Sequence, residues 1–171
     1  MSPHTSEPPE WNEANLPASF VAYASWVNET ARMTFLRDKS HVELFFLVKS
    51  DGESGLGAPP PGMDRDRIAD MLRDSIHENN IYGIVHIMEA WTYFPRQPND
   101  HTFKQVVQGE MRVADLKPED RREAVVVHYQ SRDGANFMWM SPIIRMGDRV
   151  ALSDAIEWRD PPGGRFGKLF G

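Results

Sequence analysis

The sequence predicts a single α+β domain, in which one mostly antiparallel sheet of about five strands carries two main helices packed on one face. The helical spacing of apolar residues is confined to the first half of the chain, in residues 17–37 and 64–79. Runs rich in β-branched and aromatic residues dominate from residue 81 onward. Short turns that contain glycine join the later runs, and strands joined by hairpins are antiparallel.

The first predicted helix runs from Pro17 to about Arg37. Proline suits the first turn of a helix, because the N–H that it lacks would have no partner there. One apolar stripe recurs at steps of three and four residues, which is the period of a helix face. Its members are Phe20, Ala24, Val27, Ala31 and Phe35. The second predicted helix runs from Asp64, a good N-cap residue, to about Asn79.

Residues 81–94 predict the central strand of the sheet. They form the longest nearly uncharged run of the chain, and both alternating sets of side chains are largely apolar. Such a strand is covered on both faces, or covered on one face and shielded by loops on the other. Glu89 is the single carboxylate in this run.

Further strands surround the central one, with a hairpin signal at residues 132–134 and a second tight turn at residues 147–148. They are predicted at residues 41–49, 125–129, 136–146 and 150–158. Pro142 predicts an edge position or a bulge, because proline cannot donate a hydrogen bond to the ladder. A homodimer through an edge near the C-terminus is one hypothesis that follows.

Composition excludes several classes of protein. The chain has 171 residues, of which 40% are hydrophobic and 26% charged, as is typical of a globular domain with a core. A net charge of −6 opposes a broad nucleic-acid surface, although a local basic patch stays open. The absence of cysteine excludes disulfides and thiolate sites. With no apolar run of about 18 residues and no signal-peptide pattern, we expect a soluble cytoplasmic protein without a membrane partner.

The domain is predicted to span residues 16–159, between flexible tails at residues 1–15 and 160–171. The first tail is rich in Pro, Ser and Glu, and the second in Gly and Pro. A tail that carries large apolar side chains beside cations can dock into a groove or onto an acidic surface. The candidate partner-binding residues are Trp11, Arg165, Phe166, Lys168 and Phe170.

Several short motifs occur together between residues 64 and 153. They are Glu89-Ala90-Trp91, the loop Pro118-Glu-Asp-Arg-Arg-Glu-Ala124, the turn Asp133-Gly134 and the strand end Ile144-Arg145. As a set they resemble a pattern of small bacterial and phage-type proteins, in which a Glu-Ala-Trp strand, a Pro-x-Asp-Arg-x-Glu loop and a β-hairpin follow a helix. The resemblance implies a shared fold and carries no assigned activity, so no catalytic residue is transferred. The insertion from Pro95 onward departs from the pattern.

Glu89 is the residue most open to a chemical interpretation. It is flanked by apolar side chains, and a buried unpaired charge is costly, so this carboxylate should be paired or neutral. The available partners are Arg121, Arg122 and Arg145. A structural Glu–Arg pair that fixes the long loop is the favoured interpretation, and a general acid or base is the other.

Three histidines, His41, His86 and His128, lie on predicted strands and could in principle bind a divalent metal. No two of them have the spacing of metal ligands, and a lone histidine on an apolar face is usually a hydrogen-bonded core residue. We therefore expect no metal and no cofactor.

We expect a non-catalytic binding or interaction module, with a protein partner or a second copy of the chain as its target. The alternative is a small hydrolase or lyase in which Glu89 acts with Arg122 or Arg145 and a nearby histidine. Its candidate catalytic residues are Glu89, His86, His128, Arg122 and Arg145. An enzyme needs a pocket where Glu89 and a histidine converge, and a module needs an exposed apolar patch or a free sheet edge. A nucleic-acid function ranks third, because it would need Arg and Lys gathered with aromatics on one face.

Overall fold

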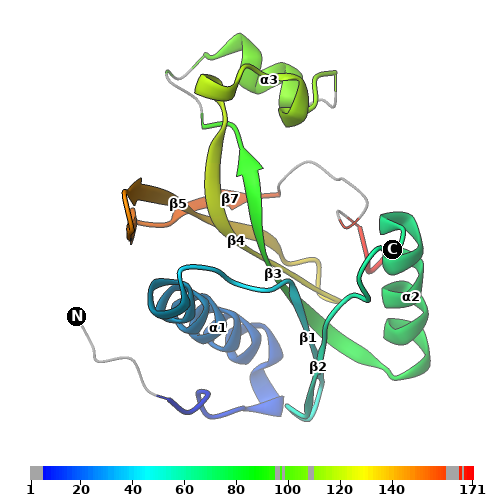
Figure 1. The fold of residues 1–171 in the computed structure, drawn as a ribbon. Helices are drawn as coiled ribbons and strands as arrows, with labels where there is room; N and C mark the ends of the chain where they lie inside the picture. The colour runs from blue at the N-terminus through cyan, green and yellow to red at the C-terminus, as the bar shows by residue number, and fades with distance from the viewer. Residues whose placement is uncertain (1–5, 95–96, 98, 108–109, 161–165, 167) are drawn as a thin grey trace.

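The computed structural model describes residues 6–94, 97, 99–107, 110–160, 166 and 168–171. Seven strands form one antiparallel sheet in the order β2-β1-β3-β4-β5-β6, and β7 pairs with β5 as well (Figure 1). The strands are β1 (Leu44–Lys49), β2 (Ser54–Gly57), β3 (Ile81–Thr92), β4 (Arg122–Ser131), β5 (Asn136–Met146), β6 (Arg149–Leu152) and β7 (Ile156–Arg159). The helices are α1 (Leu16–Asp38), α2 (Arg65–Glu78) and α3 (His101–Val107), with 3₁₀ turns at Glu13–Asn15, Val113–Asp115 and Pro118–Asp120. The α+β class is confirmed, with seven strands in place of about five.

Helix α1 begins and ends close to the predicted residues. The side chain of Asn15 caps its first turn by accepting the N–H of Ala18, and Pro17 lies in that turn. The helix ends where Lys39 adopts a left-handed conformation with φ of 59° and donates its N–H to the Phe35 carbonyl. The whole predicted stripe is buried against the sheet. The helical period of this stripe therefore predicted correctly which face of α1 packs on the sheet.

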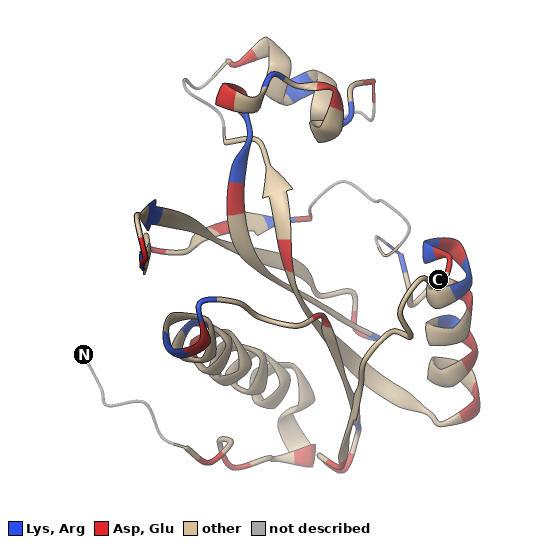
Figure 2. Ribbon diagram, in the orientation of Figure 1, with Lys and Arg blue, Asp and Glu red and all other residues tan. Residues whose placement is uncertain are grey.

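The two long helices cover opposite faces of the sheet, where the sequence predicted one face for both. Alternation along β1 explains the difference: Phe46 and Val48 pack with α1, whereas Phe45 and Leu47 pack with α2. In Figure 1, α1 and α2 accordingly lie on either side of β1 and β3. Figure 2 shows charged residues along the whole of α2, but on α1 only toward its C-terminal end. The strands apolar on both sides are thus covered on both sides.

Close contact between α1 and the central strand depends on Gly83. A Cβ atom at this position would lie 2.4 Å from the ring of Phe20, which is far inside van der Waals contact. Phe20 in turn packs edge-to-face against Tyr82 and Tyr129, with ring centroids 5.7 and 5.9 Å apart. The missing side chain in β3 therefore makes room for the buried ring of Phe20.

Pro142 does not lie at an outer edge, which was one of the two positions that the sequence predicted, the other being a bulge. It pairs with Ala124 of β4 on one side, and on the other side β5 changes its neighbour from β7 to β6. The Pro142 carbonyl accepts the N–H of Ser153 at 2.9 Å, in the segment between β6 and β7. Because the N and C=O of a strand residue point to the same side, the missing N–H falls at this break in the ladder.

Arg32 of α1 donates hydrogen bonds at the same interruption of the β5 ladder. Its Nη1 donates to the Ser141 hydroxyl at 2.5 Å and to the Ser153 carbonyl at 3.0 Å. Ser141 is fully buried, so this guanidinium gives hydrogen bonds to polar groups that would otherwise have no partner at the interruption of the ladder.

Among the described residues, no helix combines the length and the apolar character that a membrane crossing requires.

Candidate functional site

The C-terminal segment, which is Phe166 and residues 168–171, lies on the face of the sheet that α2 covers. Leu169 is only 4% exposed and is inserted into an apolar groove between α2 and the strands. We call this the α2 groove. Its buried residues are Phe45, Ile68, Leu72, Ile81 and Ile84. A segment predicted to be a flexible tail thus contributes a buried side chain to an apolar cluster of its own chain.

Gln130 of β4 fixes the backbone of the C-terminal segment at two points. Its Nε2 donates to the Phe166 carbonyl, and its Oε1 accepts the N–H of Leu169 at 3.1 Å. Gln130 is 6% exposed, so these bonds are made away from bulk water. A side-chain amide presents one donor and one acceptor, as the backbone of a neighbouring strand does. Gln130 therefore recognises main chain and is indifferent to the side chains that the main chain carries.

Phe166 lies over an ionic network at one end of the α2 groove. Its ring is 5.1 Å from the ring of His86 and 5.8 Å from that of Phe45, and the guanidinium carbon of Arg65 is 4.9 Å from its centroid. Aromatic and cation–π contacts of this kind add to the burial of apolar area. The aromatic ring thus contacts the sheet and α2 at once.

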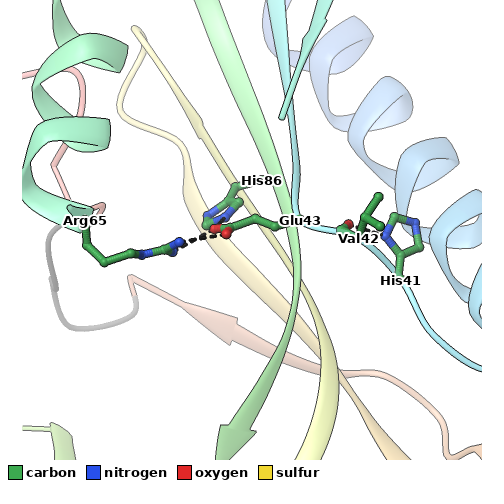
Figure 3. A network of polar contacts seen from close by, with 5 residues as sticks. All are labelled: His41, Val42, Glu43, Arg65 and His86. Atoms are coloured by element: carbon green, nitrogen blue, oxygen red, sulfur yellow. Dashed lines mark hydrogen bonds and ion pairs between the residues drawn. The ribbon is translucent and has the colours of Figure 1, made fainter. Parts of the chain in front are cut away.

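The network itself is centred on Glu43, just before β1 (Figure 3). Its carboxylate accepts hydrogen bonds from both terminal nitrogens of Arg65 and from Nε2 of His86, all at 2.7 Å. Burial alone would raise the pKa of Glu43, but the hydrogen bonds from His86 and Arg65 outweigh it and lower this pKa to about 2. The carboxylate is therefore ionised at every physiological pH.

His86 is a neutral imidazole in this arrangement. Because a carboxylate only accepts, Nε2 carries the proton, and Nδ1 is buried without a hydrogen-bond partner among the described residues. Burial lowers the pKa of His86, and the hydrogen bond to Glu43 only partly offsets this. The ring stacks on Phe45 with centroids 4.1 Å apart. His86 is thus a buried core histidine whose ring is held in place by its hydrogen bond to Glu43.

His128 lies directly opposite His86, on the neighbouring strand β4. Its Nε2 donates to the amide oxygen of Asn136 at 2.7 Å. Burial lowers the pKa of His128, and the hydrogen bond to Asn136 only partly offsets this. In the described part of the chain, no three His, Cys, Asp or Glu side chains gather in a way that could hold a metal ion.

Glu89 is exposed, and its predicted burial among apolar side chains is wrong. Its Oε1 accepts the backbone N–H of His41 at 2.5 Å, and it forms no ion pair with a described arginine. Helix α1 ends at Asp38 and β3 continues past it toward α3, so α1 does not cover this end of β3 (Figure 1). Arg145, one of the predicted partners, pairs with Glu123 at 2.6 Å.

The five candidate catalytic residues are not brought together. Glu89 and His86 lie on opposite faces of β3. Odd-numbered residues in the middle of the strand face α1, and Glu89 belongs to this set, whereas the even-numbered His86 faces α2. Arg122 and Arg145 line a surface groove beside Trp91, at the N-terminal end of β4.

The candidate partner-binding residues are distributed over both ends of the chain. Trp11 packs on its own domain: Nε1 donates to the Ser50 carbonyl at 2.9 Å, and its ring lies against Tyr23. Phe166 is partly buried in the network described above. Lys168 is exposed, Phe170 is partly buried near the end of α2, and Arg165 lies outside the described residues.

Sequence reasoning missed Glu43, Arg65 and Gln130, which come from three distant parts of the chain. A signal existed for two of them. Glu43 shares a strand face with the apolar Phe45, and Gln130 is the single amide at the end of a run of Val and Tyr. Each is a polar residue on an apolar face, which needs a hydrogen-bond partner.

No protein-family model, no curated protein and no solved structure matches this chain. The resemblance over residues 64–153 therefore stays a prediction, and the function has to be argued from the geometry alone.

Proposed function

We propose that the protein is a non-catalytic interaction module that binds a short peptide segment in the α2 groove. One observation carries the proposal: the C-terminal segment occupies this groove through two backbone hydrogen bonds to Gln130 and one buried apolar anchor, Leu169. Backbone hydrogen bonds supply affinity in peptide recognition, and pockets for individual side chains supply selectivity.

The contacts define the peptide that the groove accepts. An aliphatic anchor packs in one apolar cluster with Ile68, Leu72 and Ile84. An aromatic ring three positions earlier contacts Arg65 and His86. In this chain the two are Leu169 and Phe166. The expected partner sequence is therefore Phe-x-x-Leu, with no requirement at the exposed position of Lys168.

The small number of contacts favours exchange of the occupant. Burying one leucine contributes roughly 1.5–3 kcal/mol, and each backbone hydrogen bond about 1 kcal/mol. A partner peptide that makes the same contacts could replace the segment at a modest free-energy cost. The protein would then hold its own C-terminal segment in the free state and a partner segment in the complex.

Geometry favours this function over the small hydrolase or lyase. That reaction would require Glu89 beside the ring of a histidine in a cavity. Glu89 is exposed, its bond to His41 is to the backbone N–H and not to the ring, and it lies on the side of the sheet away from His86. Self-association through the β6 or β7 edge stays a prediction, which light scattering at high protein concentration tests.

Peptide exchange tests the proposal. A fluorescent peptide of residues 160–171 is titrated with the full-length parent and with the full-length Leu169→Asp variant, in which a charge expels the segment from the groove. We expect tight binding by Leu169→Asp and at least roughly tenfold weaker binding by the parent, whose groove is filled. Lys168→Asp is the matched control, because it alters the neighbouring exposed residue and leaves the anchor in place.

Two results would contradict the proposal. One is equal anisotropy titrations for Leu169→Asp and Lys168→Asp. The other is unchanged peptide binding after Gln130→Ala is added to Leu169→Asp. Circular dichroism establishes that each variant is folded before the titrations are compared.

A further inference from the structure

A surface hollow of about 400 Å³ adjoins the α2 groove at the residue that follows the Leu169 anchor. Leu169 and Phe170 of the C-terminal segment line this hollow together with residues of the domain. Three of the domain residues that line it are basic and none is acidic. The domain residues are Arg73, Ile76, His77, Asn80 and Arg132. We call this site the basic hollow.

Two separate elements bring cations to the basic hollow. Arg73 and His77 are four residues apart on α2, so their side chains are neighbours on one face of the helix. Arg132 follows β4 directly and reaches the end of α2 from the sheet. Its Nη2 donates to the side-chain oxygen of Asn80 at 2.6 Å and to the Ile81 carbonyl at 2.9 Å. These two bonds hold the guanidinium of Arg132 beside the C-terminal end of α2.

The positive charge of the basic hollow is only weakly neutralised within the chain. Both acceptors that the structure gives Arg132 are neutral, and no described acid forms an ion pair with it. Asp133, its neighbour in sequence, accepts the hydroxyl of Tyr82. Arg73 is 3.1 Å from Asp70, but both side chains are exposed, and such a pair contributes little to stability. The hollow can therefore take an anion without the loss of a strong internal ion pair.

The chain's own C-terminal segment brings no anion to this site. Residues 161–171 contain neither Asp nor Glu, and the residue that enters the hollow is Phe170. Its ring packs partly against the apolar cluster of the α2 groove but has no hydrogen-bond acceptor for a guanidinium group. A carboxylate at the same position would accept charge-assisted hydrogen bonds, which are stronger than bonds between neutral groups.

We propose that the partner of the α2 groove is a peptide with an acidic residue directly after its anchor, Phe-x-x-Leu-Asp or Phe-x-x-Leu-Glu. Its carboxylate binds Arg132 and Arg73 in the place of the Phe170 ring. This inference rests on the proposed function. It also supplies what exchange requires, because the tethered segment has the advantage of a high effective concentration. The partner offsets that advantage with charge-assisted bonds that the segment does not make.

Peptide titrations against a vacated groove test the preference for an acid. Leu169→Asn in the full-length protein removes the apolar anchor without adding an acid that the basic hollow would itself bind. Three fluorescent peptides of residues 160–171 are compared, with the parent sequence, with Phe170→Glu and with Phe170→Gln. At low ionic strength the Glu peptide should bind about fivefold or more tightly than the Gln peptide, since the two differ in charge and hardly in size. Salt at about 0.5 M should reduce this ratio.

Arginine variants locate the preference. Arg132→Gln or Arg73→Gln, each added to Leu169→Asn, should remove most of the difference between the Glu and Gln peptides. Arg67→Gln is the matched control, because it makes the same change in net charge at an exposed position of α2 that does not line the hollow. Circular dichroism establishes that each variant is folded.

The outcomes separate this inference from the proposed function. If the parent peptide does not bind to Leu169→Asn, the peptide-binding function fails and the acidic partner fails with it. If the parent peptide binds while the Glu and Gln peptides bind equally, only the acidic partner is overturned. The same holds if Arg67→Gln reduces the preference as much as Arg132→Gln does, since the effect would then come from net charge and not from the basic hollow.

Discussion

The N–H of Leu169 donates to the side-chain oxygen of Gln130 at 3.1 Å, across 39 residues of sequence. The same amide donates to the Phe166 carbonyl, so one residue in the interior of β4 fixes the whole C-terminal segment. Replacement of Gln130 by leucine should leave both backbone groups unpaired beside the sheet. We expect a loss of about 1–3 kcal/mol in the free energy of unfolding, measured by urea denaturation.

Hydrogen exchange locates the same effect. In Gln130→Leu, the amide of Leu169 should exchange much faster than in the parent, while the amides of β3 keep their protection. Equal protection of Leu169 in both proteins would show that the segment is held by apolar contacts alone.

Arg32 should contribute to stability far more than Arg37, the other arginine of α1. Arg32→Ala leaves the buried Ser141 hydroxyl and the Ser153 carbonyl without their donor, which should cost about 1–3 kcal/mol. Arg37→Ala on the same helix is the control, since its ion pair with Asp38 is solvent-exposed and should contribute nothing measurable. Thermal denaturation compares the two, and equal melting temperatures would show that the break at Pro142 needs no polar partner.

Glycine at position 83 should be required by the packing of α1. In Gly83→Ala the new methyl group meets the ring of Phe20, and the overpacking should cost about 1–3 kcal/mol or displace α1. Gly57→Ala is the matched control, because nothing lies within 4 Å of its Cβ position. A comparison of urea midpoints for the two variants checks this, and a neutral Gly83→Ala would mean that Phe20 can move aside freely.

Acid should destabilise the protein through its two buried histidines. Burial lowers the pKa of His86 and of His128, so below the unfolded value of about 6.5 the unfolded chain binds protons that the folded chain does not. Stability is therefore unaffected above that pH and falls below it, by up to about 1.4 kcal/mol per pH unit for each histidine. The groups that face His86 are His128, Glu43 and Arg65, and Glu43 stays ionised throughout this window.

Urea denaturation between about pH 7.5 and pH 5 measures this dependence. His86→Phe should remove a large part of the slope, because phenylalanine retains the stacking on Phe45 without a titrating group. His77→Gln, which alters an exposed histidine at the end of α2, should leave the slope unchanged. A slope that is the same in all three proteins would place the acid sensitivity elsewhere.

The sequence by itself determined the α+β class, the ends of α1 and α2, and the central strand. These features depend on local patterns. The apolar stripe of α1 repeats with the period of a helix, and Asp64 caps α2 through the N–H groups of Asp66 and Arg67. Residues 81–92 are rich in the β-branched and aromatic side chains that favour a strand. A period of this kind is present in the residues themselves, whatever the rest of the chain does.

Only the tertiary structure decided the environments of individual polar residues. Glu89 is exposed because α1 ends before it reaches that end of β3, which is a matter of the relative lengths of two distant elements. Glu43, Arg65 and His86 meet because the register of β1 on β3 and the position of α2 bring them together. The C-terminal segment is ordered against Gln130 for the same reason. Contacts between residues far apart in sequence follow from register and packing, and no local pattern encodes them.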